Sequence, residues 1–322
     1  MSALALLAVL GASAAAAKPP SRPGMQAKSY GVLVIADGGA GSWRTALGQL
    51  RQSMKDAAVE SVESSDSTSI QRALDKLRGQ HVGKIVAIPL ELVNESPEME
   101  SLRYLFGIRE NPVSDRPDVT RENEPPKALG GGTKSTLQLG NNRGPRRLKS
   151  DAELVLTATI DKSPVLAEIL ADRAAKLARK PASEAVVLVG RAPRSDKALA
   201  DWKTAASAIA ESVRLKGGFR ESAVLYVRDG VRAGQQDKDR DENKATLRKL
   251  VTQGAVVAVP LAPDGLRVGQ LLQRQLGSGG YRWNGKGVLG DPRLAEWIES
   301  TSAAASTLPD VRQFRDTTGG FR

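Results

Sequence analysis

The sequence predicts an α/β protein built from two Rossmann-like domains, each with a mainly parallel sheet, helices on both faces and a cleft between the domains. Two observations support this fold class. Short runs that are apolar throughout alternate with segments of helical periodicity, as in parallel sheets that are covered on both faces. In addition, matching segments occur twice in the same order, which indicates an internal repeat. The matched pairs are Gly31–Ala36 with Ala185–Gly190, Ile85–Leu90 with Val256–Leu261, and Ser163–Glu168 with Asp291–Glu296.

The elements of the first half follow from local patterns. The strand 31–36 runs into a glycine-rich turn, and Leu47, Leu50 and Met54 then recur at helical spacing. The polar run 64–67 offers N-caps for a helix with the apolar face Ile70, Ala73, Leu74 and Leu77. Lys84–Leu90 is the second strand, and we expect a further helix to begin at Ser163 and Pro164.

The first half contains 43 more positions than the second between its Pro-Leu strand end and its last helix, because Pro89 to Pro164 is 75 positions and Pro260 to Pro292 is 32. The surplus centres on residues 111–150, which are rich in Pro, Gly, Asn and charge, so we expect a disordered insertion there. Within it, Gly132–Ser135 lacks the strand and the glycine before lysine that a phosphate loop needs.

In the second half, strands are expected at 185–190 and 256–261, and a helix is expected to begin at Asp291. The charged run 231–242 is expected to be a solvated loop that leads into a helix with Leu247 and Leu250, and it lacks the spacing of a calcium loop. From residue 301 the periodicity is lost, which predicts a mobile tail over 301–322. The expected domains are 29–180 and 181–300.

The first 28 residues differ in composition from the rest. Residues 1–17 are uncharged and rich in Leu and Ala, and Ala14–Ala17 offer the small side chains that a signal peptidase accepts. A proline-rich linker, 18–28, follows. The run is shorter than the ~20 residues that span a bilayer. We therefore expect a signal peptide and a periplasmic or secreted protein, although no basic residue precedes the run. The alternatives are a misassigned start codon or a buried Ala-rich terminus in a cytoplasmic protein.

Composition excludes several kinds of site. The chain has no cysteine, so disulfides, thiolate metal sites, cysteine nucleophiles and a lipid-anchored amino-terminal cysteine are ruled out. The net charge of +11 would suit a polyanion, but most basic residues are dispersed among acids on helical segments, and the cluster Arg143–Lys149 is punctuated by Gly and Pro. We expect no nucleic-acid partner and no membrane span.

The matched segments resemble the sirohydrochlorin chelatase family, the class II chelatases that insert cobalt or ferrous iron into a carboxylate-rich tetrapyrrole. Halves of that family open with a strand ending in Gly-His-Gly-Ser or Gly-Arg-Gly-Ser, continue with a strand ending in Pro-Leu, and close with His-Pro-x-Leu-Ala-Glu. The corresponding turns are Ala36–Gly39 and Gly190–Pro193. The resemblance covers the chain from about Tyr30 to Ser300.

The resemblance also implies histidines that the chain lacks. Asp37 stands where the family has its best-known metal-binding histidine, Pro97 falls near the second one, and Ser163 and Asp291 replace the two histidines that precede proline. Cobalt and ferrous iron prefer imidazole ligands. The single histidine, His81, lies in a turn that leads into the second strand, at the sheet edge opposite the ligand crevice. A serine–histidine hydrolase is therefore not supported.

Three functions remain open. The first is a divergent chelatase-like protein that does not insert metal efficiently and binds a tetrapyrrole or other polyanionic small molecule in the cleft. Guanidinium groups suit carboxylates, and the candidate ligands are Arg44, Arg191, Arg194 and Arg267. The second is an active chelatase of the cobalamin or siroheme pathway that handles a divalent metal, cobalt or iron, through carboxylates, with Asp37 as the catalytic residue; its candidate ligands are Asp37, Glu91, Glu95 and Asp291. The third is a non-catalytic interaction module.

Overall fold

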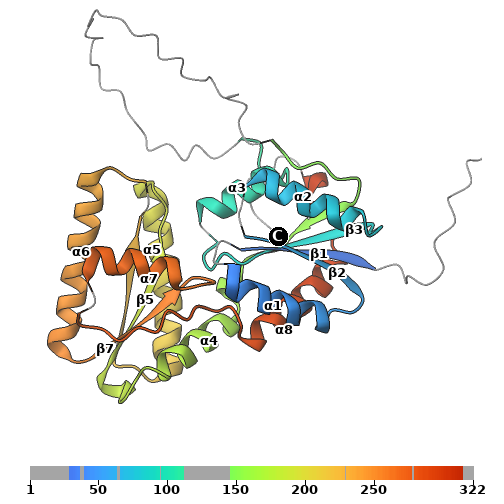
Figure 1. Cartoon of the computed structure of the whole chain (residues 1–322). Coiled ribbons are helices and arrows are strands. Elements are labelled where there is room, and N and C mark those ends of the chain that lie inside the picture. Colours follow the sequence, from blue (N-terminus) through green and yellow to red (C-terminus); the bar gives the residue numbers. More distant parts are fainter. Residues whose placement is uncertain are drawn as a thin grey trace, which may run out of the picture.

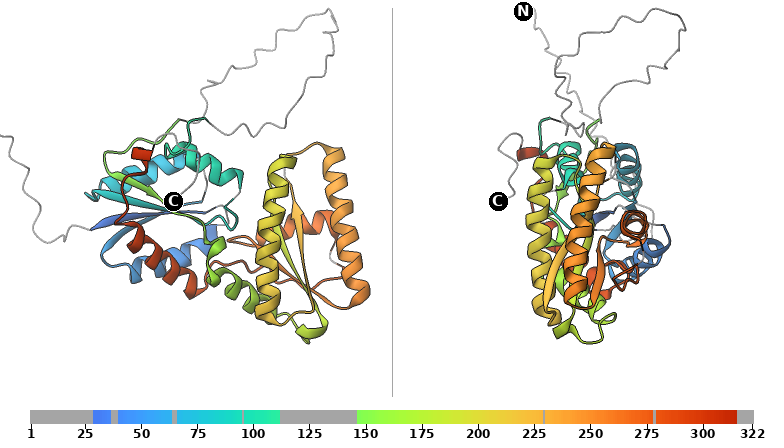
Figure 2. Two further views of the ribbon diagram at one scale, coloured as in Figure 1. Left: turned by 180° about the vertical axis from the view of Figure 1, so that it is seen from behind. Right: turned by 90° about the vertical axis from the view of Figure 1, so that its left-hand side faces the viewer.

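The computed structural model describes residues 29–36, 40–63, 66–94, 96–111, 146–228, 230–277 and 279–314. It contains two parallel sheets that lie side by side (Figures 1 and 2). The first has the order β2-β1-β3-β4 and consists of β1 (Tyr30–Ile35), β2 (Ala57–Val62), β3 (Lys84–Pro89) and β4 (Glu153–Leu156). The second has the order β6-β5-β7 and consists of β5 (Ala185–Arg191), β6 (Glu221–Val227) and β7 (Val256–Leu261). A parallel bridge between Val257 and Arg282 continues the second sheet beyond β7.

Helices cover both faces of each sheet, which is why the central strands are buried on both sides. The α-helices are α1 (Ala40–Ser53), α2 (Ser67–Arg78), α3 (Pro97–Leu105), α4 (Pro164–Ala175), α5 (Asp196–Gly217), α6 (Ala233–Gln253), α7 (Leu266–Leu276) and α8 (Pro292–Ala305). One face of the first sheet packs on α2 and α3, and one face of the second packs on α6 and α7. The predicted fold class, with two Rossmann-like α/β units, is confirmed.

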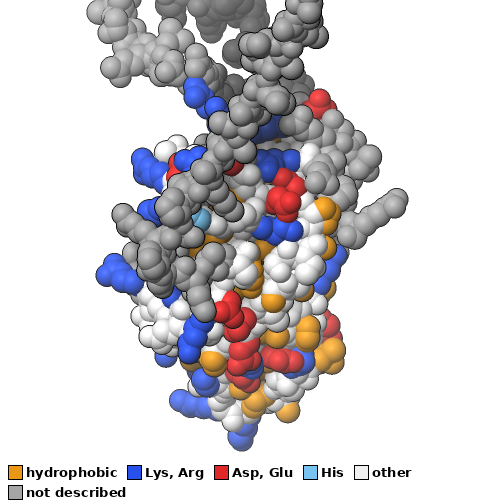
Figure 3. Space-filling view, turned by 90° about the vertical axis from the view of Figure 1, so that its right-hand side faces the viewer, with side chains coloured by type: hydrophobic (Ala, Val, Ile, Leu, Met, Phe, Trp, Pro, Cys, Tyr) orange, Lys and Arg blue, Asp and Glu red, His pale blue; other side chains and the backbone are white. Residues whose placement is uncertain are grey.

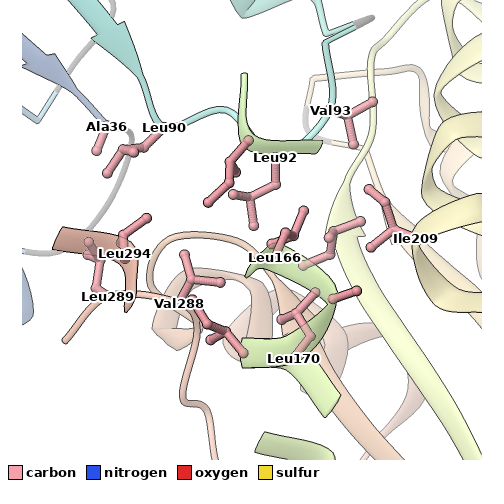
Figure 4. Close-up of a cluster of buried hydrophobic side chains, with 14 of the residues drawn as sticks. Ala36, Leu90, Leu92, Val93, Leu166, Leu170, Ile209, Val288, Leu289 and Leu294 are labelled. Carbon is pink, nitrogen blue, oxygen red and sulfur yellow. The ribbon is translucent and has the colours of Figure 1, made fainter. Parts of the chain in front are cut away.

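The remaining face of each sheet packs into one shared core. Strand residues of both sheets, such as Val86 and Val257, belong to a single buried cluster together with α1, α4, α5 and α8. In chain order α4 ends the first half, yet it packs against α5 and β7 of the second. Likewise α8, which comes from the second half, packs against α1 and β3 of the first. Figure 4 shows Leu166, Leu170 and Leu294 of these two helices converging on this core.

The starts of these helices explain two of the substituted family positions. Ser163 and Asp291 are the N-caps of α4 and α8, each followed by proline at the first helical position. The Ser163 hydroxyl accepts a hydrogen bond from the Val165 amide at 3.3 Å, and the Asp291 carboxylate accepts one from the Arg293 amide at 3.2 Å. Asp66 likewise caps α2, within the run in which N-caps were predicted. Short side chains with an oxygen acceptor satisfy amides that a helix start leaves unpaired.

Two segments differ from the sequence predictions. Most of the run 231–242 is helical, since α6 begins at Ala233. Two polar residues on the inner side of α6, Asp239 and Asn243, are buried and form hydrogen bonds with residues in β6 and directly after it. The chain also stays ordered past residue 301. There α8 continues to Ala305, and the 3-10 helix η3 (Val311–Phe314) follows, with Arg312 donating to the carbonyls of residues 150 and 152. The predicted signal peptide, the linker, most of the insertion (112–145) and residues 315–322 lie outside the described residues.

Within the described ranges, no helix combines the length and the apolar character needed to cross a bilayer. Figure 3 views the molecule from the right-hand side of Figure 1, and on that face lysine and arginine side chains are interspersed with acidic ones rather than joined in one basic surface. This distribution agrees with the expectation that the excess positive charge is dispersed.

Candidate functional site

A pocket lies where the two halves meet, beyond the carboxyl ends of the strands. Its lining comes from the loop between β3 and α3, the turn between β5 and α5, and the start of α7. The empty volume is about 790 Å³, including the part that is open to solvent. Ala36, directly after β1, and Gly190, near the end of β5, both lie at carboxyl ends of parallel strands, but neither is among the residues that line this pocket. Ligands of open α/β sheets bind at this edge, so the pocket is the candidate functional site.

The turn after β5 brings Arg191 to the pocket. Arg191 is the last residue of β5 and lines the cavity. The next residue is anchored by a 3.0 Å hydrogen bond from the Ala192 amide to the carbonyl of Val227 on β6. Pro193 is buried, and the Ser195 hydroxyl caps α5 by accepting from the Ala198 amide at 3.1 Å. The backbone that carries Arg191 is therefore fixed by its neighbours rather than by the side chain itself.

Trp202 lies in the same wall of the pocket. It is 2% exposed, lines the cavity and packs edge-on against Tyr226, with ring centroids 6.4 Å apart. A Cβ built on Gly190 would come within 2.6 Å of its ring, so the ring occupies the space that any other residue at 190 would need. Sequence reasoning missed Trp202 because it sits in a helix at the spacing of core residues, where an aromatic ring carries no specific signal.

The start of α7 supplies the second arginine of the pocket. Arg267 lies in the first turn of α7 and lines the cavity. The carboxylate of Asp264 accepts a 2.8 Å hydrogen bond from the Leu266 amide and so satisfies one free amide of the helix start. Of the four predicted arginines, Arg191 and Arg267 thus come together at one pocket.

Acidic side chains share the pocket with these arginines. Glu91 and Glu98 line it from the first half, and Asp264 lines it from the second. The described lining therefore holds three acids and two arginines. A pocket with this mixture of charges is not suited to anions in general. It suits a ligand that presents carboxylates to the guanidinium groups and hydrogen-bond donors to the acids.

The other two predicted arginines lie elsewhere. Arg44 is exposed on α1. Arg194 is exposed in the β5–α5 turn, and its guanidinium lies over Gly230, where a Cβ would be 3.0 Å from Nε. Neither belongs to the described lining of the pocket.

The predicted carboxylate ligands are not brought together in the part of the chain that can be described. Glu91 lines the pocket, whereas Asp291 lies at the start of α8, and Asp37 and Glu95 lie outside the described residues. Among the described residues, no group of three or more acidic or histidine side chains could hold a metal ion. The metal ligand set proposed from the sequence therefore stays a prediction.

Asp291 has protein partners at its helix start. Its carboxylate accepts from the Arg293 guanidinium at 2.9 and 3.0 Å and lies 3.8 Å from Arg173 of α4. Arg293 also pairs with Asp172 of α4 at 2.7 Å, so these charges join α4 to α8. Burial raises the pKa of the Asp291 carboxyl, but the hydrogen bonds and charges of Arg293 and Arg173 outweigh burial and hold the pKa below its ordinary value of 3.8.

This depressed pKa predicts part of the acid sensitivity of the fold. An acid whose folded pKa is lowered stabilises the fold above its unfolded pKa, and this contribution is lost as the pH falls through the folded pKa. We expect the free energy of unfolding of Asp291→Asn to fall less than that of the wild type as the pH is lowered below about 4. The measurement is the free energy of unfolding in urea at several pH values. Arg293→Met should also reduce the pH dependence of the free energy of unfolding in this acidic range. If both variants keep the pH dependence of the wild type, the assignment to Asp291 is wrong.

His81 lies where the sequence places it. It follows α2 in an exposed turn before β3, at the amino edge of the first sheet, with a positive φ of 60°. The pocket lies at the carboxyl edge, so the only imidazole of the chain is remote from it. A histidine-dependent reaction in the pocket is not supported.

Comparisons with known proteins give a limited result. No family model matches the chain, and no curated protein matches it. A solved structure similar to it is DR2241 from Deinococcus radiodurans, described as a multi-domain protein with structural similarity to chelatases, at 15% identity and a TM-score of 0.48. The alignment covers 86% of this chain and 55% of that one, so the chain spans about half the length of this neighbour.

Two further neighbours have different descriptions. One is a putative transcription repressor of the LacI family from Corynebacterium glutamicum, at 10% identity and a TM-score of 0.35, covering 89% of this chain and 92% of that one. The other is an ABC transporter solute binding protein from Clostridium phytofermentas with bound L-rhamnose, at 8% identity and a TM-score of 0.35, covering 88% and 83%. The fold assignment therefore rests on the observed topology, and these proteins assign no function to the chain.

Proposed function

We propose that the pocket between the halves binds a small molecule with several carboxylates, and that the protein does not insert metal efficiently. The observation that carries the proposal is that Arg191 and Arg267, from two separate elements, line one pocket at the carboxyl edge of the second sheet. A guanidinium group binds a carboxylate through two parallel hydrogen bonds and keeps its charge at any physiological pH.

The acids of the pocket narrow the class of ligand. Glu91, Glu98 and Asp264 would repel a molecule that carries carboxylates alone. A tetrapyrrole with carboxylate side chains also has pyrrole N–H groups, which can donate to these acids. The sequence resemblance to chelatases points to the same class.

The absence of metal insertion is proposed from the chemistry of the residues. Insertion needs a ligand that holds the incoming metal and a base that takes the pyrrole protons. The resemblance assigns these roles to histidines, and this chain has Asp37 and Asp291 at two of those positions. Oxygen ligands favour harder ions such as magnesium and calcium over cobalt and ferrous iron. Export of the protein to the periplasm or the medium, as its first residues suggest, would separate it from a cytoplasmic biosynthetic pathway.

The proposal is tested by titrating the purified protein with sirohydrochlorin and, separately, with citrate. We expect Arg191→Ala and Arg267→Ala each to weaken binding of the better ligand about 10- to 100-fold, the range for losing a hydrogen bond to a charged group. Arg44→Ala is the matched control, because it removes the same charge from an exposed site on α1. Equal affinities in all three variants would refute the proposed site.

A metal-insertion assay with cobalt and ferrous iron separates the alternatives. We expect no insertion above the uncatalysed rate. Insertion that is lost in Asp37→Ala would instead support a working chelatase with carboxylate ligands. A protein that binds neither probe would favour an interaction module.

A further inference from the structure

Arg228 is a buried charge that the proposed binding site does not use directly. It follows β6 immediately, and its side chain is 0% exposed. Its Nε and Nη2 atoms donate to the two carboxylate oxygens of Asp239 on α6, each at 2.7 Å. Asp239 is itself 2% exposed, so both charges of this pair are removed from water.

Such a pair is costly to build. Removing two charges from water costs several kcal/mol per ion, and a well-packed apolar pair is often as stable as a buried ion pair or more stable. Stability alone is therefore a weak reason for an arginine at this position. A requirement for a fixed geometry would be a better reason, because the guanidinium fork holds several acceptors at once in one plane.

The third nitrogen of Arg228 reaches the turn that carries Arg191. Nη1 donates to the carbonyl oxygen of Arg194 at 3.0 Å and to the carboxylate of Asp196 at 2.7 Å. The amide of Ala192 donates to the carbonyl of Val227, the residue before Arg228. Residues at the end of β6 therefore form hydrogen bonds with the turn on both sides of the buried Pro193.

We propose that Arg228 is a positioning residue that holds the turn 191–196 so that Arg191 faces the pocket. Asp239 orients Arg228 from α6, and Arg228 in turn fixes the backbone that follows Arg191. This inference deepens the proposed function and rests on it for its effect on ligand affinity. Its effect on the turn itself does not depend on any ligand.

The test is a double-mutant cycle with the conservative variant Arg228→Lys, which keeps the charge and loses the fork. With the better of the two probes, sirohydrochlorin or citrate, we expect Arg228→Lys to weaken binding about tenfold. In an Arg191→Ala background the same change should have no further effect. In an Arg267→Ala background it should again weaken binding about tenfold, because Arg267 lies on a different element.

Arg312→Lys is the matched control for a loss of structure. Arg312 also joins an aspartate, Asp310, to backbone carbonyls, but it does so beside β4 in the first half. It should leave affinity unchanged. If Arg228→Lys weakens binding equally in the Arg191→Ala and Arg267→Ala backgrounds, the role of Arg228 is only structural and the inference is wrong.

Asp196→Ala tests the same link if Arg228→Lys fails to fold, because Asp196 is 75% exposed. The loss of ligand affinity in Asp196→Ala should likewise depend on the presence of Arg191.

Hydrogen exchange without ligand keeps the two proposals separate. We expect faster exchange of the Ala192 amide in Arg228→Lys, while the Ala258 amide, bonded to the carbonyl of Arg282 in the same half, keeps its rate. If the wild type binds neither probe, the proposed function fails but this result still decides whether Arg228 holds the turn. An unchanged rate at Ala192 would overturn the inference.

Discussion

Asp239→Ala is expected to lower the free energy of unfolding by about 3–5 kcal/mol, the usual cost of removing one partner of a buried ion pair. The variant leaves the guanidinium of Arg228 in a fully buried place without its bidentate partner. Asp239 also accepts a 3.2 Å hydrogen bond from Gln235, which is lost as well, whereas the Tyr226 hydroxyl keeps its shorter 2.8 Å hydrogen bond to Glu242.

The measurement is urea unfolding followed by circular dichroism. The control is Asp237→Ala on the same helix, whose carboxylate is 57% exposed and pairs with Arg240 at 2.8 Å. An exposed pair of this kind contributes less than about 1 kcal/mol. If Asp239→Ala and Asp237→Ala have the same free energy of unfolding, the buried Arg228–Asp239 pair contributes no more than an exposed pair, and the prediction is wrong.

Leu170→Ala is expected to cost about 2–5 kcal/mol, the range for truncating a fully buried leucine. Leu170 is 0% exposed on α4, within the core that both sheets share. Because this core joins the halves, we expect a single unfolding transition that shifts as a whole. Leu215→Ala is the control, since Leu215 is 65% exposed on α5 and should change stability by less than about 0.5 kcal/mol. Two separate transitions, with only one of them shifted, would contradict a shared core.

The four apolar strands predicted from the sequence are β1, β3, β5 and β7. β1, β3 and β5 are central strands, and β7 lies next to β5 at the end of the strand order β6-β5-β7. Their predicted limits agree with the observed ones to within a residue or so because both faces are covered, so every position is apolar. The strands β2, β4 and β6 were not predicted, and all three lie at the edges of their sheets. β4 has only four residues, and β2 and β6 have polar positions, such as Glu60, which pairs with Arg51 of α1, and Glu221, which pairs with Lys249 of α6. Such sequences lack the apolar run on which the prediction depends.

The site could be predicted in part. Arg191 was found because it follows an apolar strand in a turn that resembles the family turn, and the carboxyl edges of parallel strands gather such turns. Arg228 also follows a strand, but that strand was not recognised, so nothing marked the arginine as buried. The pairing of Arg228 with Asp239 could not be foreseen, because a charged run such as 231–242 more often faces solvent than a neighbouring strand.

The exchange of α4 and α8 between the halves also bears on how the chain folds during its synthesis. One face of the first sheet is covered by α8, whose residues Leu294 and Ile298 are among the last of the core to be made. Until they emerge, that face lacks part of its cover, although all four strands of the sheet are complete by residue 156. The first half therefore cannot reach its final packing until α8 has been synthesised, so the two halves complete their native packing together.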